Sequence, residues 1–344
     1  MKGGGEINNF TKSILFVTLI ASLAFVPQNM ALPNATQAYS PLVQEQVGAR
    51  ALGLGGAYVA VSDGFAAPLF NPAGVTRYDN FEVGGANHSF PWDLNTTAIA
   101  GGTSLSRLIE VKEDSSGTIN SLMKNFSFGG SYITSSMEVR VSDPEGNPMG
   151  KVQLSENIWS GTLGVEIPNI GGLGASIKNY NSLRPKSGQD GEDVTISGIG
   201  LNLGLLSESI NGFRIGAAGF DVGGTNLDWQ NSTLDYDITG KYSVGGSYTL
   251  ELPFAFSSHL LTSGQYTIGD TIPDNFRIGI EMSIWGFAIR GGYYLPGKYM
   301  GNEQESRYSI GAGIRLEPVS VDAALIEAPV TDESTIVFSG SLYF

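Results

Sequence analysis

The stretch ARALGLGGAYVAVSDGFAAPLFNPAGVTR, from Ala49 to Arg77, differs in character from the sequence on either side of it. Four glycines lie within residues 53–64, and glycine lets two chain segments approach closely. Pro72 fixes its own φ and favours an extended or turn conformation at Asn71. Because the centre of the stretch is small and apolar, we expect a compact segment without strands that packs inside another structure.

Two simpler interpretations of this stretch are a dinucleotide-binding loop and an ordinary surface loop. Gly53-Leu54-Gly55 begins a G-x-G-x-x-G pattern, but Tyr58 occupies the position of the last glycine. The strand–helix–strand pattern that such a loop requires does not follow. Dinucleotide binding is therefore disfavoured.

Three motifs in the stretch resemble the N-terminal signature of the FadL-like outer-membrane barrels, and most closely the branch with the PorV and PorQ proteins. They are RALGLGGA at 50–57, SDG at 62–64 and NPAG at 71–74. The middle motif departs from the A-D-D of the family, because Ser62 and Gly64 flank Asp63. The resemblance continues more faintly to the end of the chain. In the family this segment lies inside the barrel as a hatch or plug, which implies these plug residues: Arg50, Gly53, Gly55, Gly56, Asp63, Asn71, Pro72 and Gly74.

The composition limits the class of protein. Glycine accounts for 47 of 344 residues, which is about twice the average usage and suits curved strands and many turns. The chain has no cysteine, so it can form neither a disulfide nor a thiolate metal site. A net charge of −14 argues against a nucleic-acid partner, which would require a basic face.

The N-terminus is typical of a secretory signal peptide. Lys2 and Lys12 precede or flank an apolar run over 14–26, which is too short to span a membrane as a helix. Cleavage after Ala31 or after Ala38 would fit equally. No later run of about 18 apolar residues exists, so an exported chain that enters a membrane must do so as a barrel. We therefore expect a signal peptide and leader at 1–38, a plug segment at 39–79 and a barrel at 80–344.

The sequence after the plug segment predicts β-strands to the end of the chain. Over residues 275–284, for example, Phe276, Ile278 and Ile280 alternate with polar residues and glycine. The strands are expected at 80–90, 96–105, 126–140, 151–168, 172–183, 194–206, 212–222, 240–252, 256–268, 275–285, 286–296, 306–316, 317–328 and 334–344. The fold class is thus an all-β, transmembrane antiparallel barrel of about fourteen strands with an N-terminal plug inside its lumen.

A soluble sandwich also alternates, so two further features decide for the barrel. If the first strand runs outward, the inner turns are short and the outer loops are longer, as in outer-membrane barrels. The segment 106–125 is the exception, and we expect a short helix or a mobile loop there. The last strand is apolar on one face and ends in Phe344, which resembles the signal that the barrel-assembly machinery of diderm bacteria recognises. The aromatic residues near strand ends fit either interfacial girdles or packing in turns and in the core: Phe90, Trp92, Trp159, Trp229, Tyr266, Trp285 and Tyr299.

Charged residues of both signs fall on the face predicted to line the lumen. They are Glu82, Lys178, Arg214, Arg277, Glu281, Arg290, Arg307, Arg315 and Asp322. One interpretation is a cross-strand salt-bridge network that holds the plug, with Arg50, Asp63 and Arg77 as its partners. The other is a permeation path lined by charge. Acidic residues gather in the predicted outer loops, where they are either solvated or bridge divalent cations to lipid; none has the spacing of an EF-hand.

The sequence contains none of the G-x-S-x-G, H-E-x-x-H or P-loop motifs, so we expect neither an enzyme nor a metal or other cofactor. Two functions are left open. FadL resemblance implies passive uptake of a small hydrophobic or amphipathic solute across the outer membrane. PorV and PorQ resemblance implies a non-transport component or docking partner of a protein-secretion system. The expected partners are outer-membrane lipid, the barrel-assembly machinery, and either such a solute or secretion-system proteins.

Overall fold

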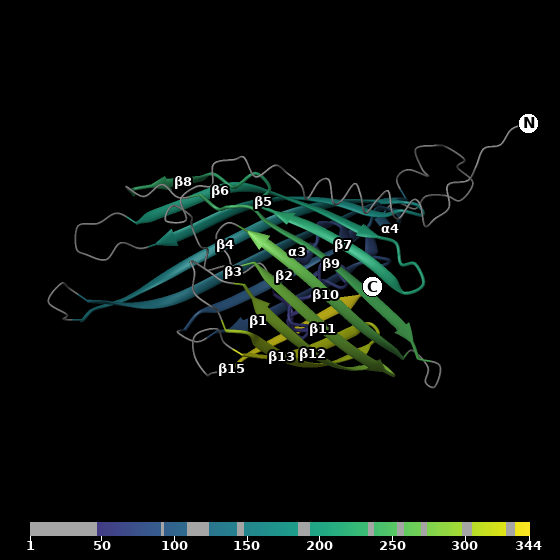
Figure 1. Ribbon diagram of the computed structural model, residues 1–344. Helices are drawn as coiled ribbons and strands as arrows, with labels where there is room; N and C mark the ends of the chain where they lie inside the picture. The colour runs from purple at the N-terminus through teal and green to yellow at the C-terminus, as the bar shows by residue number, and fades with distance from the viewer. Residues whose placement is uncertain are drawn as a thin grey trace, which may run out of the picture.

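A computed structural model of the chain describes residues 47–90, 93–108, 124–142, 148–184, 193–232, 237–252, 258–269, 274–297, 305–327 and 334–344. The predicted signal peptide and leader lie outside these residues, as do residues 39–46 of the predicted plug segment. Fifteen strands form one antiparallel sheet (Figure 1). They are β1 (Glu82–Ser89), β2 (Asn95–Ser104), β3 (Phe126–Ser142), β4 (Pro148–Ile167), β5 (Gly171–Arg184), β6 (Val194–Ser207), β7 (Phe213–Phe220), β8 (Leu227–Gln230), β9 (Lys241–Glu251), β10 (His259–Gly269), β11 (Asn275–Ile284), β12 (Phe287–Pro296), β13 (Arg307–Leu316), β14 (Val319–Glu327) and β15 (Ser334–Tyr343).

The sheet closes on itself. β1 pairs with β2 on one edge and with the last strand, β15, on the other. β7 and β8 share one position in the wall, because both pair with β6. β7 pairs with residues 203–206 of β6, and β8 pairs with residues 195–198. The wall therefore has fourteen strand positions, which confirms the predicted antiparallel barrel and its strand number.

The outer face of this cylinder is apolar. Ile278 and Ile280 on β11 are exposed, while Gly279 and Glu281 between and beside them are buried. In a closed barrel, an apolar outward face is the one that meets lipid. The chain thus has the form of an integral membrane β-barrel, as predicted. Among the described residues, no helix is long and apolar enough to cross a bilayer.

The predicted strand limits agree with the observed ones to within a few residues, apart from β8. This short strand lies in the segment 223–239, which the sequence placed in an outer loop. Asp221, Gly223 and Gly224 adopt positive φ angles and interrupt the wall before β8 resumes the pairing with β6. The helix α4 (Leu105–Leu108) overlaps the start of the segment 106–125, and residues 109–123 lie outside the described part of the chain.

Two strands are much longer than a membrane requires. A tilted transmembrane strand needs about 9–11 residues. β3 has 17 residues and β4 has 20, whereas β11 to β15 have nine or ten each. Consequently β3 and β4 extend well past the other strands at the end where β3 finishes and β4 begins (Figure 1).

Residues 47–81, here called the inner segment, lie within the barrel (the purple chain in Figure 1). The segment contains two short α-helices, α2 (Ala49–Gly53) and α3 (Ala67–Phe70), and a 3-10 helix, η2 (Pro72–Arg77). Most of its apolar side chains are buried, and the largest group of them forms one cluster with inward side chains of the wall. The absence of strands from this segment agrees with the prediction, while its role as a plug stays a prediction.

Candidate functional site

One end of the inner segment is held by charge, at a site we call the Arg50 anchor. The Arg50 guanidinium donates to both carboxylate oxygens of Glu281 on β11, from Nε at 2.9 Å and from Nη2 at 3.0 Å. The same guanidinium forms an ion pair with Asp63. The Tyr58 hydroxyl donates to Asp63 over 2.5 Å. Arg50 therefore joins two parts of the inner segment to the wall.

The Arg50 anchor continues along the wall. Arg290 on β12 pairs with Glu281 and, over 2.6 Å, with Asp322 on β14. His259 on β10 lies 3.5 Å from Glu281. Since Glu281 is only 2% exposed, its charge must be compensated by these partners. The predicted salt-bridge network that holds the segment is thus present in the geometry for Arg50, Asp63, Glu281, Arg290 and Asp322.

Asp63 ionises more readily than an ordinary aspartate. Burial on its own would raise the pKa of its carboxyl, but the Arg50 guanidinium and the Tyr58 hydroxyl hold that pKa below its usual value. The ion pair therefore stays charged over the whole physiological range of pH.

The other end of the inner segment is held without charge, at a site we call the Asn71 anchor. The buried Asn71 amide donates to the carbonyls of Val59, at 2.9 Å, and of Leu205 on β6, at 2.8 Å. Its oxygen accepts from the Ala73 amide and so caps η2. One side chain therefore fixes the start of η2, a second turn of the inner segment and the wall.

Glycines in the wall make room for the inner segment. A Cβ on Gly174 of β5 would overlap backbone atoms of Pro72 and Ala73, and one on Gly292 of β12 would overlap the backbone of Gly55. Ten inward glycines on nine strands are in this position, and we call them the glycine belt: Gly84, Gly102, Gly164, Gly172, Gly174, Gly204, Gly216, Gly245, Gly279 and Gly292. The high glycine content, which the sequence related only to curvature and turns, thus also serves close packing.

The remaining predicted plug residues are glycines that lie in close contact with the wall or with other parts of the inner segment, or that adopt positive φ angles. Gly53 lies against Gly311 and Arg290 of the wall, and Gly55 donates to the Ser309 hydroxyl over 3.1 Å. Gly55 and Gly56 have positive φ, which their lack of a side chain allows. Gly74 lies so close to Ser62 and Ala67 that a side chain there would overlap both.

Sequence reasoning missed a third contact between the inner segment and the wall. The Gln265 side chain on β10 accepts hydrogen bonds from the backbone amides of Tyr58 and Val59, both at 3.0 Å. Gln265 alternates with exposed residues such as Tyr266, so it could have been assigned to the inner face by its period. Its uncharged side chain excluded it from a set that was chosen by charge.

The other predicted lumen residues face inward but do not join the Arg50 anchor. Lys178 pairs with Asp221 at 2.6 Å, beside the interruption between β7 and β8. Glu82 accepts from the Phe65 amide and the Ser341 hydroxyl. Arg277 and Arg307 both lie over the ring of Tyr294, and Arg315 lies over Tyr343. These residues are therefore distributed over several separate sites.

Arg77 and Trp229 lie elsewhere than the salt-bridge and girdle interpretations place them. Arg77 is exposed and forms no ion pair among the described residues. Its positive charge repels that of Arg214 on β7, and the Nε of Arg214 has no hydrogen-bond partner among those residues either. Trp229 does not belong to a girdle, because it packs against the interior cluster. Trp159, Tyr266 and Trp285 are exposed, as a girdle requires. Phe90 stacks on the inward His88, while Trp92 and Tyr299 lie outside the described residues.

An apolar band crosses the inner face of the first five strands. Ala86, Ala98, Ile133, Ile158 and Tyr180 are direct cross-strand neighbours from β1 to β5, and all are buried. They belong to the same cluster as the aromatic side chains of the inner segment. The interior of an outer-membrane barrel is usually polar, so this band is a departure from the common pattern.

The predicted terminal signal, Phe344, is exposed at the inner end of the barrel. Its backbone amide donates to the Phe81 carbonyl over 2.9 Å, and the two rings lie 6.1 Å apart. Its role in assembly stays a prediction. Among the described residues, no group of three or more acidic, histidine or cysteine side chains could hold a metal ion.

No protein-family model matches the chain, and no curated protein matches it in sequence. Solved structures do match its fold. The monoaromatic hydrocarbon channel CymD superposes with a TM-score of 0.60 at 12% identity, covering 87% of this chain and 97% of CymD. The toluene transporter TbuX of Ralstonia pickettii gives 0.54 at 14% identity, covering 87% and 99%. A FadL homologue of Pseudomonas aeruginosa gives 0.50 at 13% identity, covering 86% and 97%.

These comparisons establish the class of fold. The chain has the fourteen-stranded barrel of the FadL-type outer-membrane channels, which confirms the fold that the resemblance implied. At such low identity the likeness concerns the fold alone, and the PorV and PorQ branch is not confirmed.

Proposed function

We propose that the chain is a passive channel that admits small hydrophobic or amphipathic solutes through the outer membrane. The observation that carries this proposal is the apolar band, Ala86, Ala98, Ile133, Ile158 and Tyr180, inside a barrel whose interior also holds many buried serine and charged side chains. A water-filled pore gains nothing from buried isoleucines on its inner wall. An apolar solute gains a surface on which it can leave water.

The similarity in fold to the hydrocarbon channels CymD and TbuX supports the same proposal. The proposed path passes polar side chains such as Thr96 and Glu156, which are buried one inward position from the band. The solute then contacts the band and the inner segment packed beside it. The Arg50 anchor on the far wall serves to hold the segment in place and is unfavourable for an apolar solute.

An uptake measurement tests this function. A diderm host that lacks a hydrocarbon channel is made to express the chain, and uptake of labelled toluene and of labelled glucose is compared with a vector control. We expect toluene uptake to rise several-fold and glucose uptake to stay at the control level. An unchanged toluene uptake by cells with folded barrel in the outer membrane would reject the proposal.

A matched pair of variants links uptake to the apolar band. Ile133→Asn places an amide in the band and, at about 1–3 kcal/mol for an unsatisfied polar group, should lower toluene uptake by about tenfold. Ile133→Val keeps the same buried position apolar, and should leave uptake unchanged. Equal loss in both variants would mean that the band itself does not matter.

A second candidate function is supported by the long strands β3 and β4. Their projection past the other strands offers a surface outside the membrane on which an exported protein could dock. This is the non-transport role in secretion that the PorV and PorQ resemblance implies. Purification from the native membrane separates the two: a co-purifying protein that is lost when residues 138–152 are shortened, together with unchanged toluene uptake in the host, would favour docking.

A further inference from the structure

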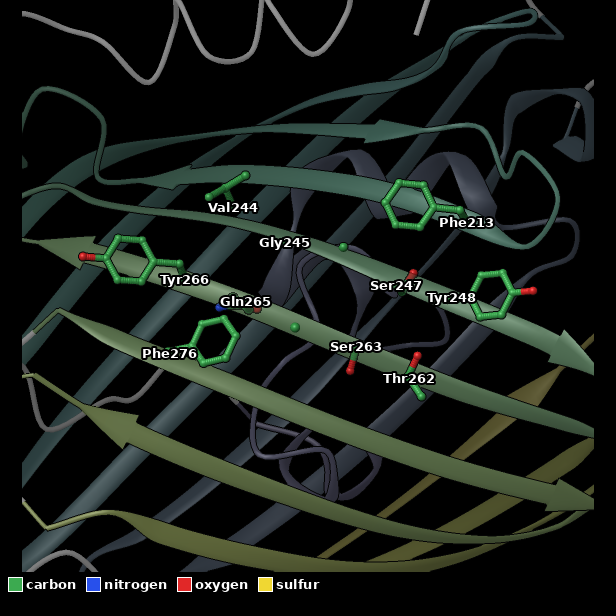
Figure 2. A pocket seen from close by; sticks show the side chains of 12 residues that line it. Phe213, Val244, Gly245, Ser247, Tyr248, Thr262, Ser263, Gln265, Tyr266 and Phe276 are labelled. Carbon is green, nitrogen blue, oxygen red and sulfur yellow. The ribbon is translucent and has the colours of Figure 1, made fainter. Parts of the chain in front are cut away.

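A hollow of about 430 Å³ lies on the lipid-facing side of the barrel, over β7, β9, β10 and β11 (Figure 2). Aromatic side chains stand at both of its ends. Phe213 and Tyr248 lie at one end, and Tyr266 and Phe276 lie at the other. Between them the backbone is bare at Gly246 and Gly264, which are direct cross-strand neighbours. The hollow therefore has a glycine floor and an aromatic rim.

The sequence makes this hollow by omitting two side chains. On β9 the outward positions are Val244, Gly246 and Tyr248, and on β10 Thr262, Gly264 and Tyr266. A Cβ at Gly246 would meet the ring of Phe213 at 3.6 Å and the Arg214 carbonyl at 3.7 Å, and one at Gly264 would meet Phe276 at 3.8 Å and the Arg277 carbonyl at 3.9 Å. These distances are ordinary contacts, so the floor is open space that a side chain could fill.

The opposite face of the same residues holds the inner segment. Gly245 is the neighbour of Gly246, and a Cβ there would overlap a methyl group of Val59. Gln265, next to Gly264, accepts the backbone amides of Tyr58 and Val59. Ser247 donates to the Ala60 carbonyl over 3.3 Å. The hollow and this contact thus lie on two sides of one thin piece of wall.

We propose that this hollow is a binding site for one acyl chain of an outer-membrane lipid, and that the bound chain stiffens the contact between the wall and residues 58–60. The hollow is continuous with the apolar outer face, because its rim residues Phe213, Val244, Tyr248, Tyr266 and Phe276 are each 42% to 49% exposed there. Hydrocarbon is the medium that surrounds this face, and an empty hollow would forgo dispersion contacts on one side.

The size of the hollow favours a chain over a protein partner. Its volume falls in the range of small-molecule sites, about 300–1,000 Å³. Twelve residues line it, whereas a stable protein interface uses about 20–30 residues on each side. A flexible hydrocarbon chain can also follow a floor between two aromatic ends, and the lining offers no charged side chain to a polar ligand. The proposal is independent of whether the barrel transports a solute.

Native mass spectrometry with a defined lipid tests the site. The purified full chain in detergent is depleted of lipid and titrated with palmitoyl-oleoyl phosphatidylethanolamine. We expect one adduct that forms at a lower lipid concentration than the others. Gly264→Leu and Gly246→Leu fill the floor and should raise the concentration needed for this adduct at least tenfold. Gly161→Leu is the matched control, since Gly161 is an exposed glycine of β4 with no neighbour within 4 Å.

A second measurement on the unaltered chain covers the case in which a variant fails to fold. Phosphatidylethanolamine with a diazirine in its acyl chain is photolysed in vesicles that contain the barrel. Labelling should concentrate on peptides with residues 244–248 and 262–266, and exceed labelling around residue 161. In detergent, removal of the bound lipid should speed hydrogen exchange of the Tyr58 and Val59 amides several-fold.

Several results would overturn the proposal. These are uniform labelling around the barrel, a preferential adduct that Gly264→Leu leaves unchanged, and a folded dimer that excludes lipid from this face. Exchange at residues 58–59 that is indifferent to lipid would overturn the coupling between the two sides of the wall.

Discussion

The two ends of the inner segment are fixed to the same barrel by different physical means. The Arg50 anchor uses ion pairs to β11 and, through Arg290, to β12 and β14. The Asn71 anchor uses a single neutral side chain and backbone that lies directly on wall glycines. Charged contacts tolerate small displacements because the attraction between charges falls slowly with distance. Closely packed atoms do not tolerate them, because the repulsion between overlapping atoms rises steeply. The Asn71 end should therefore be the more sensitive to small changes of shape, and the Arg50 end to changes of charge.

The largest effect is expected from a single methyl group at the Asn71 end. Gly174→Ala would drive a Cβ into the backbone of Pro72 and Ala73, so we expect a loss of about 3 kcal/mol in the free energy of unfolding. Urea titration in detergent, read by the mobility of the folded barrel on gels, measures it. Gly161→Ala adds the same methyl group on the lipid-facing side and should change stability by less than about 0.5 kcal/mol. Similar losses in both variants would contradict the role of the glycine belt.

Removal of the charge at the other end should have a somewhat smaller effect. Arg50→Met leaves the buried Glu281 with Arg290 as its main partner, and we expect a loss of about 2 kcal/mol. This is less than a fully buried pair would lose, because the Arg50 side chain is 23% exposed. Arg107→Met is the control, since Arg107 is exposed and, within the described part of the chain, makes hydrogen bonds to residues 79 and 80. Hydrogen exchange should quicken over residues 49–63 and not over 71–78.

Loss of the neutral side chain should disturb the opposite part of the segment. Asn71→Ala leaves the carbonyls of Val59 and Leu205 without this donor and removes the cap of η2, at a cost of about 1.5 kcal/mol. Exchange should then quicken over residues 71–78. Because the two anchors share no partner side chain, the double variant with Arg50→Met should lose the sum of the two within about 0.5 kcal/mol. A markedly non-additive result would show that the ends are coupled.

The smallest effect concerns acid. The pKa of Asp63 is lowered in the folded chain, so its ionised form contributes stability above the pKa of the unfolded chain, about 3.9. That contribution is lost as the pH falls through the lower, folded pKa. The stability difference between the wild type and Asp63→Asn should thus be present at pH 6 and shrink steadily below about pH 4. A difference of the same size at pH 3 would mean that the charge of Asp63 does not matter.

Much of the barrel could be predicted from the sequence because one rule, alternation, repeats fourteen times. The rule assigns Glu281 and Arg290 to the lumen as readily as it assigns Ile280 and Ile289 to lipid. Charge then selects the residues of the Arg50 anchor, since opposite charges on one enclosed face must find each other. For Arg50 and Asp63 this reasoning succeeded, although they lie outside the strands.

The Asn71 anchor and the apolar band were not predicted in detail for a physical reason. Contact between backbone and glycine leaves no pattern of its own, because a glycine at a bend and Gly174 under Pro72 look alike in a sequence. Ile133 and Ile158 read as part of alternating strands, and their common row depends on register between strands, which the sequence does not reveal. Arg77 was misplaced because its sign suits a partner, but η2 ends there and directs it to solvent.

The seam between β1 and β15 sets a condition on how the barrel can form. Glu82 pairs with Tyr343 and Ser89 with Ile336, so the pairing of β1 is complete only when β15 is in place. Until the final ten or so residues arrive, β1 has a free edge, and an open edge in contact with hydrocarbon has no water to satisfy it. This pairing closes a loop that runs from β1 to β15 and contains every other strand. Closing so long a loop is costly in entropy and makes the pairing slow to form. Loss of the terminal strand should thus abolish closure of the barrel, whereas loss of an outer loop would change only one end of it.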